Sequence, residues 1–320
     1  MMQATTTLGR TDLLVPRLGV GAMTWGQASR LQRWMPAQLA YGGAHGRAEE
    51  QRAFEASLAA GVTFFDTAAM YSGGASERRL GELAPGRAVV LATKFPPSPW
   101  TRAEALPRAL DASLARLGRR TVDLYQHHFP VAWIAIPRLM GLLAEAVAAG
   151  KVRAVGVSNY SAAQLRLAHA SLAERGVALA SNQVEYSLLH RQPEVNGVLE
   201  TCRELGVTLI AYQPLASGAL TGKYGAGTRP TGVRRGMPAF RGRGLAAIQP
   251  VVAVLREIGG RYGKSPAQVA LRWLIEQEGV LAIPGAKNGK QAAENAGALT
   301  FGLTAGEVAA LEQATQAWRG

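Results

Sequence analysis

The chain has 320 residues, 48% of them hydrophobic and 18% charged, a composition that excludes disordered and fibrous proteins. A single cysteine, Cys202, excludes a disulfide framework and a cysteine-rich zinc site, and the five histidines form no H-E-x-x-H pattern, so we expect no metal centre. No apolar run approaches the roughly 20 residues that a membrane span needs. The N-terminal segment lacks the apolar stretch of a signal peptide, which predicts a cytoplasmic protein that does not bind membranes.

The formal net charge of +13 raises the question of a polyanionic partner. Most arginines are scattered singly, and the densest group lies in the glycine-rich segment 229–243, where Phe240 is the one aromatic residue. Nucleic-acid surfaces usually combine a basic groove with several stacking rings, so we expect no nucleic-acid partner. The segment is interpreted either as an ordered lid near a phosphate-bearing ligand or as a mobile, solvated loop. Its arginines are Arg229, Arg234, Arg235, Arg241 and Arg243.

Eight short β-like segments occur along the chain, most of them separated by stretches with helical periodicity. Several are continuously apolar, as expected of strands that are buried on both faces. Eight strand-and-helix units without an obvious break predict the α/β class and a closed (β/α)8 TIM barrel, formed by residues 1–320 as a single domain. The segments are 17–23, 62–67, 88–94, 122–128, 152–158, 181–186, 208–214 and 280–286.

Capping patterns predict where three helices begin. Thr101 with Glu104, Ser161 with Gln164, and Ser265 with Gln268 all have the spacing of a capping box. After the first of these, one apolar stripe ends at a glycine, which is typical of a helix C-terminus. The stripe consists of Leu106, Leu110, Leu114 and Leu117, and the glycine is Gly118.

A doubly wound open sheet is the structural alternative. Its G-x-G-x-x-G fingerprint is incomplete at residues 19–24, because Thr24 stands where the third glycine belongs. Segments 26–48 and 215–249 are too long for ordinary connections. In a barrel they are long loops after the first and seventh strands, on the face where active sites lie.

Four polar residues lie at or near the carboxyl ends of three consecutive predicted strands. Asp66 ends VTFFD, Lys94 ends VVLATK and His128 ends DLYQHH, while Tyr71 follows Asp66 by five residues. Barrel enzymes draw catalytic residues from the ends of several strands, so we expect these side chains to meet. His127 and His128 point to opposite faces of a strand, and periodicity leaves open which one faces the interior.

These residue types suit proton donation to an oxygen that gains negative charge. A nearby ammonium group is expected to lower the pKa of Tyr71 from its usual value near ~10, and Asp66 supplies the counter-charge for Lys94. A histidine orients the carbonyl group or shares in delivering the proton. Reduction of a carbonyl group by hydride requires such a donor.

The segment GVTFFDTAAMYSGGASERRLGE, residues 61–82, resembles the G-x-x-x-x-D-T-A-x-x-Y-x-x-G-x-S-E-x-x-L-G motif of the aldo-keto reductase family. Further matches are LATK, VDLYQHHFP, VRAVGVSNYS, SNQVEYSLLHR and AYQPLASGALTGKY, and the resemblance extends from LGVGAMTWG to IPGAKNGKQAAEN. It implies that the catalytic residues are Asp66, Tyr71, Lys94 and His128. His128 is favoured over His127 because the family histidine stands two residues before a proline, here Pro130.

The resemblance also implies an extended nicotinamide cofactor that is bound without a Rossmann fold. Lys287 would neutralise a 2′-phosphate and so favour NADPH/NADP+ over NADH. The implied substrate-binding residues are Trp25, Tyr71 and His128. The implied cofactor-binding residues are Met23, Asp66, Ser158, Asn159, Gln183, Tyr212, Gln213, Pro214, Leu215, Ser217, Gly218, Lys223, Gly285, Lys287, Gln291, Glu294 and Asn295.

Together these features predict an NADPH-dependent oxidoreductase that reduces small aldehydes or ketones to alcohols, with Tyr71 as the proton donor. One alternative is a regulatory module that binds the cofactor with little turnover. Another is a lysine-dependent barrel enzyme in which Lys94 forms a Schiff base. Further aromatic and apolar residues are candidates for the substrate wall or for ordinary core: Trp34, Met35, Tyr41, Trp100 and Trp133.

Overall fold

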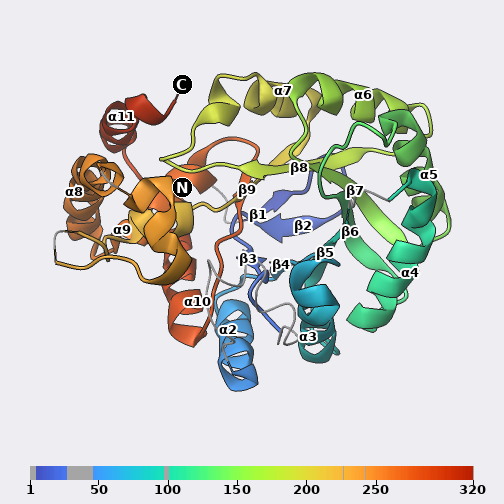
Figure 1. The fold of residues 1–320 in the computed structure, drawn as a ribbon, viewed down its shortest axis with the longest axis horizontal. Helices are drawn as coiled ribbons and strands as arrows, with labels where there is room; N and C mark the ends of the chain where they lie inside the picture. The colour runs from blue at the N-terminus through green and yellow to red at the C-terminus, as the bar shows by residue number, and fades with distance from the viewer. Residues whose placement is uncertain (1–4, 27–45, 97–100, 226, 242, 320) are drawn as a thin grey trace.

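The computed structural model describes residues 5–26, 46–96, 101–225, 227–241 and 243–319 (Figure 1). Within them, eight parallel strands that follow the chain order form one sheet, and each overlaps a predicted segment. Backbone bridges from Leu18 to Ala282 and from Gly21 to Gly285 join the first strand to the last, which closes the predicted barrel. The strands are β3 (Val20–Gly21), β4 (Phe64–Asp66), β5 (Val90–Phe95), β6 (Val122–His127), β7 (Val152–Ser158), β8 (Leu179–Glu185), β9 (Thr208–Tyr212) and β10 (Val280–Ala282).

Helices surround the strands (Figure 1). Two of them, α8 and α9, lie between β9 and β10, and α11 follows α10 near the C-terminus. The helices are α2 (Arg47–Ala59), α3 (Ala75–Leu83), α4 (Leu106–Leu117), α5 (Ile136–Ala148), α6 (Ala162–Ala173), α7 (Val198–Leu205), α8 (Gly244–Tyr262), α9 (Pro266–Glu276), α10 (Gly289–Ala296) and α11 (Ala305–Ala314).

Two of the three predicted capping boxes are present. Ser161 caps α6 and Ser265 caps α9, each with the reciprocal glutamine bond. The box predicted at Thr101 is wrong, because α4 begins at Leu106 after a 3-10 turn and has no side-chain cap. A proline in the first turn of α4, whose fixed φ favours that position, accounts for the later start. The leucine stripe is buried as predicted, and Gly118 ends the helix in the left-handed conformation.

The core has two layers, one between strands and helices and one inside the barrel. The interior layer includes Phe64, Leu124 and Ile210, and it continues into the hairpin formed by β1 (Thr5–Thr7) and β2 (Leu14–Pro16). The backbone N–H of Gly9 donates to Thr208 Oγ1 at the start of β9. The hairpin, seen at the centre of the ring in Figure 1, therefore covers the amino end of the strands. This leaves polar residues to gather at the carboxyl ends.

The two predicted long loops follow the first and seventh strands of the barrel. Most of 26–48 lies outside the described residues. The described residues of 215–249 include the 3-10 turns η5 (Ala216–Thr221), η6 (Gly232–Gly236) and η7 (Pro238–Phe240), and the last of them already belong to α8. Phe240 is buried against Tyr224, with ring centroids 5.1 Å apart, and belongs to a small apolar cluster with residues of η5 and α8, so this residue of the arginine-rich segment is packed. None of the described helices is long and apolar enough to cross a membrane.

Candidate active site

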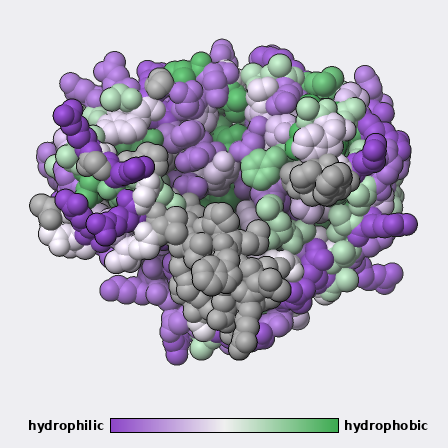
Figure 2. Space-filling view, in the orientation of Figure 1, coloured by the Kyte–Doolittle hydropathy of each residue, from purple (hydrophilic) through white to green (hydrophobic). Residues whose placement is uncertain are grey.

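A cavity of about 760 Å³ opens at the carboxyl ends of the strands, within the usual size range of small-molecule sites. All seventeen residues expected to bind the cofactor line it, together with Tyr71 and His128. Hydrophilic residues dominate the rim of the face shown in Figure 2, and apolar residues appear toward its middle. Ten further residues line the cavity: Gly21, Thr24, Met70, Phe129, Thr221, Tyr224, Arg234, Ala267, Ile283 and Pro284.

A buried ion pair lies beneath one end of this pocket. The Lys94 side chain is 0% exposed, pairs with Asp66 Oδ1 and donates to the backbone oxygen of Thr67 at 2.8 Å. Burial lowers the pKa of Lys94, but Asp66 and Tyr71 raise it by more, so the net shift is upward. Lys94 is therefore an ammonium ion at neutral pH and does not line the pocket. Both facts argue against the Schiff-base alternative, which needs an accessible neutral amine.

Tyr71 lies directly over this ion pair, at the start of the 3-10 turn η2 (Tyr71–Gly74). The Lys94 ammonium lies 5.1 Å from the centre of the tyrosine ring, and its charge acts to lower the pKa of the phenol. Burial raises the pKa of Tyr71 by more than Lys94 lowers it, so the predicted lowering is wrong in direction. The phenol therefore keeps its proton at neutral pH and can donate it.

The two adjacent histidines have separate environments. His128 lines the pocket, and its ring meets that of Tyr71 edge-on at 5.7 Å. His127 points the other way, and its Nδ1 lies 2.7 Å from the Tyr160 hydroxyl in the outer core. Burial, with a smaller contribution from Lys94, lowers the pKa of His128 to about 2. The imidazole in the pocket is therefore neutral throughout the physiological pH range.

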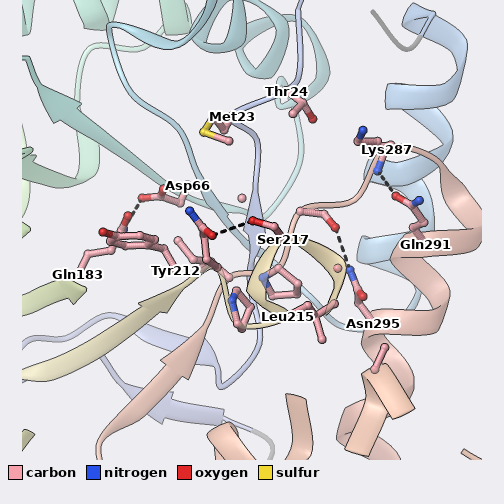
Figure 3. A pocket seen from close by; sticks show the side chains of 18 of the residues that line it. Met23, Thr24, Asp66, Gln183, Tyr212, Leu215, Ser217, Lys287, Gln291 and Asn295 are labelled. Atoms are coloured by element: carbon pink, nitrogen blue, oxygen red, sulfur yellow. Dashed lines mark hydrogen bonds between the residues drawn. The ribbon is translucent and has the colours of Figure 1, made fainter. Parts of the chain in front are cut away.

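Amide side chains surround the second oxygen of Asp66. Its Oδ2 accepts from Gln126 Nε2 at 3.0 Å and from Gln183 Nε2 at 2.9 Å; the latter bond is drawn in Figure 3. The Ser158 hydroxyl donates a hydrogen bond of 2.7 Å to the backbone oxygen of Gln183. Sequence reasoning missed Gln126, whose alternation on β6 with the outward-facing His127 could have indicated an inward side chain.

The backbone of the pocket wall is unusual. All five non-glycine residues with positive φ in the described part of the chain lie in the pocket lining or directly beside a lining residue. Such conformations are uncommon and cluster at functional sites. They are Ser72, Asn159, Gln213, Ala216 and Ser217. Two hydrogen bonds hold the Asn159 side chain in place. Its Nδ2 donates to His128 O at 3.1 Å, and its Oδ1 accepts from the Tyr212 hydroxyl at 3.0 Å.

The other end of the pocket carries positive charge. Lys287, which follows β10, lines it together with Lys223 and Arg234. Burial, and then repulsion from Arg234 and Lys223, lowers the pKa of Lys287 to about 8. Gln291 accepts from the Lys287 backbone N–H at 2.9 Å, and Asn295 donates to Gly285 O at 3.2 Å (Figure 3). Three cations that repel one another suit an anionic ligand. Composition alone did not indicate which arginine of 229–243 reaches the pocket.

The expected substrate role of Trp25 is not supported. Its side chain is 0% exposed, its indole N–H donates to Ala286 O at 2.7 Å, and it packs against Phe65 in the outer core. Trp133 is exposed, donates to Thr101 O and does not line the pocket. The other candidates for the substrate wall, Trp34, Met35, Tyr41 and Trp100, lie outside the described residues. Near Tyr71 and His128 the lining instead includes Met70 and Phe129, which sequence reasoning did not single out.

Comparison with known proteins extends these observations. The profile described as the aldo/keto reductase family matches residues 17–316. An uncharacterized oxidoreductase of Mycobacterium tuberculosis is 40% identical, over 95% of this chain and 91% of its own length. The chloroplastic pyridoxal reductase of Arabidopsis thaliana is 37% identical, over 95% of this chain and 84% of its own length. The solved structure of a glycerol dehydrogenase from Gluconobacter oxydans superposes with a TM-score of 0.83 at 25% identity, covering 98% of this chain and 95% of that chain.

Proposed function

Because the chain belongs to the aldo/keto reductase family of oxidoreductases, we propose that it reduces aldehydes or ketones to alcohols with NADPH. The observation that carries this proposal is the phenol of Tyr71 in the pocket wall, in contact with a buried ammonium and a neutral histidine. This group can give a proton to an oxygen that is gaining charge, which is the role that carbonyl reduction requires.

The pocket residues fit a dinucleotide with anionic groups at one end and an amide at the other. Lys223, Arg234 and Lys287 would hold the phosphates. Ser158, Asn159 and Gln183 would hold the carboxamide, and the Tyr212 ring would pack on the nicotinamide. When bound, the reduced nicotinamide supplies the hydride that adds to the carbonyl carbon.

The remaining chemistry belongs to the chain itself. His128 would orient the substrate oxygen toward Tyr71, and its low pKa keeps it neutral so that it does not compete as the acid. Tyr71 gives its hydroxyl proton to that oxygen as the C=O bond becomes a C–O single bond. Lys94, held by Asp66, stabilises the phenolate left behind, which regains a proton from water.

The substrate end of the pocket suits a neutral, apolar molecule. Met70 and Phe129 line this end, and both are exposed. The Phe129 ring stacks on the His128 ring, with the ring centroids 4.5 Å apart. The lining cations lie at the opposite end. A pyridoxal reductase is among the similar proteins, and pyridoxal is a flat aromatic aldehyde. We therefore propose aromatic aldehydes as the first substrates to test.

Steady-state oxidation of NADPH tests the proposed function. We expect absorbance of NADPH to fall when benzaldehyde or pyridoxal is added, with one alcohol formed per NADPH consumed. Efficient turnover would separate an enzyme from a regulatory module that only binds the cofactor. If NADPH binds but none of a broad panel of aldehydes and ketones is reduced, the proposal is wrong.

The low pKa of Lys287 predicts a pH-dependent affinity for NADPH. In the free protein the lysine loses its proton above a pH of about 8, whereas a bound phosphate raises its pKa. NADPH should therefore bind more weakly as the pH rises from about 7 to about 9.5, while NADH changes less.

The matched variant is Lys287→Met, which keeps the length of the side chain. Loss of a hydrogen bond to a charged group, worth ~1.5–3 kcal/mol, should weaken NADPH binding about tenfold or more and remove its pH dependence. Equilibrium titrations of both cofactors measure this. Equal pH dependence for NADPH and NADH would contradict the assignment of Lys287 to the 2′-phosphate.

A further inference from the structure

Gln126 is a polar residue inside the barrel that does not reach the pocket. It lies in β6, is 0% exposed, and is paired in register with Lys94 on β5 and Gly156 on β7. A buried amide is unfavourable unless its polar atoms are hydrogen bonded. Its contacts are therefore specific features of this interior.

Those contacts connect the ion pair to the amide expected to meet the cofactor. Gln126 Nε2 donates to Asp66 Oδ2 at 3.0 Å, and Gln126 Oε1 accepts from Gln183 Nε2 at 3.4 Å. Gln183 Nε2 also donates to Asp66 Oδ2 at 2.9 Å. Three side chains therefore form a closed triangle of hydrogen bonds, one corner of which is the partner of Lys94.

The chemistry of the triangle fixes which way Gln183 faces. An ionised carboxylate only accepts hydrogen bonds, so both amides must turn their NH2 groups toward Asp66. Gln126 reinforces this choice by offering its own oxygen to the same NH2 group. Oε1 of Gln183 is then the atom left to accept a hydrogen bond from a donor in the pocket, which this side chain lines.

The neighbouring strand makes room for this arrangement. A Cβ atom at Gly156 would lie 2.8 Å from Cγ of Gln126 and 2.4 Å from Oγ of Ser181, too close for any larger residue. The Ser181 hydroxyl is buried in the same interior and has no hydrogen-bond partner among the described residues. The Gln126 side chain is therefore tightly packed and hydrogen bonded, whereas the nearby Ser181 hydroxyl is packed without a hydrogen bond among the described residues.

We propose that Gln126 is a positioning residue that holds Asp66 and Gln183 in one orientation, so that Gln183 presents its oxygen to the carboxamide NH2 of the nicotinamide cofactor. This inference rests on the proposed function, because it assumes that the cofactor binds in the pocket. Gln126 itself contacts neither cofactor nor substrate and acts through its two neighbours.

A cofactor analogue isolates this effect in a binding measurement. In the 3-acetylpyridine analogue of NADP+, a methyl group replaces the carboxamide NH2, so it lacks the donor that Gln183 would accept. We expect the protein to bind NADP+ more tightly than the analogue. Gln126→Leu should weaken NADP+ binding about tenfold and change binding of the analogue less than about twofold. Gln126→Met serves the same purpose if the leucine variant does not fold.

Two further variants sharpen the interpretation. Gln183→Leu should cause the same selective loss, and the double variant should lose no more than either single variant, because both act on one contact. Ser181→Ala removes a hydroxyl from the same interior and should leave both dissociation constants unchanged. Thermal unfolding of each variant reports the structural effect separately.

Equal weakening of NADP+ and the analogue by Gln126→Leu, or no weakening of either, would overturn the inference. The first result would assign Gln126 to general stability, and the second would leave it without a role in binding. If the unmodified protein binds neither molecule, the proposed function itself fails. That result is distinct from a protein that binds both molecules and in which Gln126→Leu weakens both equally or neither.

Discussion

Tyr71→Phe is expected to reduce turnover by about a thousandfold or more and to change NADPH affinity by less than about twofold. The substitution removes the proton donor, and general acid catalysis contributes roughly 10²–10⁴ in rate. The phenylalanine ring keeps the edge-on contact with His128 and the position over Lys94. Single-turnover measurements with NADPH and an aldehyde give the rate, and equilibrium titration gives the affinity.

Tyr262→Phe is a suitable control for this experiment. Its hydroxyl donates to Glu307 at 2.8 Å on the outside of the barrel and does not line the pocket. We expect normal turnover in this variant. If Tyr71→Phe also turned over normally, the donor would have to be another group.

Asp66→Asn is expected to destabilise the protein and abolish turnover together. Removing one partner of a buried ion pair leaves an uncompensated charge and typically costs about 3–5 kcal/mol; here the Lys94 side chain is 0% exposed. Without Asp66, burial becomes the dominant influence on Lys94 and its pKa falls. Urea unfolding at neutral pH measures the loss in free energy of unfolding.

The sign of the pH dependence follows from the raised pKa of Lys94 in the folded protein. A cationic group with a raised folded-state pKa contributes stability below its unfolded pKa, which is near ~10.4, and loses it as pH rises through the folded value. The contribution is therefore fully present at neutral pH. In the unsubstituted protein it should decline only in strongly alkaline solution.

A double variant separates stability from catalysis. Asp66→Asn with Lys94→Met removes both charges and keeps similar side-chain shapes, so most of the lost stability should return. Turnover should stay absent, because Tyr71 would lack the ammonium group that stabilises its anion. A double variant that regains turnover would contradict the assigned role of Lys94.

The architecture was largely predictable because its signals are local. Apolar strand segments, capping serines and the Leu106 to Leu117 stripe each depend on residues close in sequence. The exception, Thr101, shows the limit: a proline one residue into α4 determined the start instead of the capping pattern. Lys94 was also recognisable locally, since a lysine in an apolar strand needs a partner.

The finer features of the site depend on contacts between distant strands. Gln126 and Gln183 meet at Asp66 across 60 and 117 residues of sequence. Strand periodicity predicts which face a side chain points to, but it does not predict its hydrogen-bond partners. The pKa of Tyr71 depended on the balance of burial against Lys94, which sequence does not provide. Trp25 follows the first strand on the same side of the barrel as the catalytic residues, but its ring lies in the outer core and its indole N–H donates to Ala286 O.

Transfer of a labelled hydrogen tests the central proposal most directly. NADPH carrying deuterium at both positions of the reactive nicotinamide carbon would be incubated with the protein and benzaldehyde, and the product examined by mass spectrometry. We predict benzyl alcohol with one deuterium on the carbon that bore the oxygen. Alcohol without deuterium, or no alcohol from a protein that binds NADPH, would contradict the proposal.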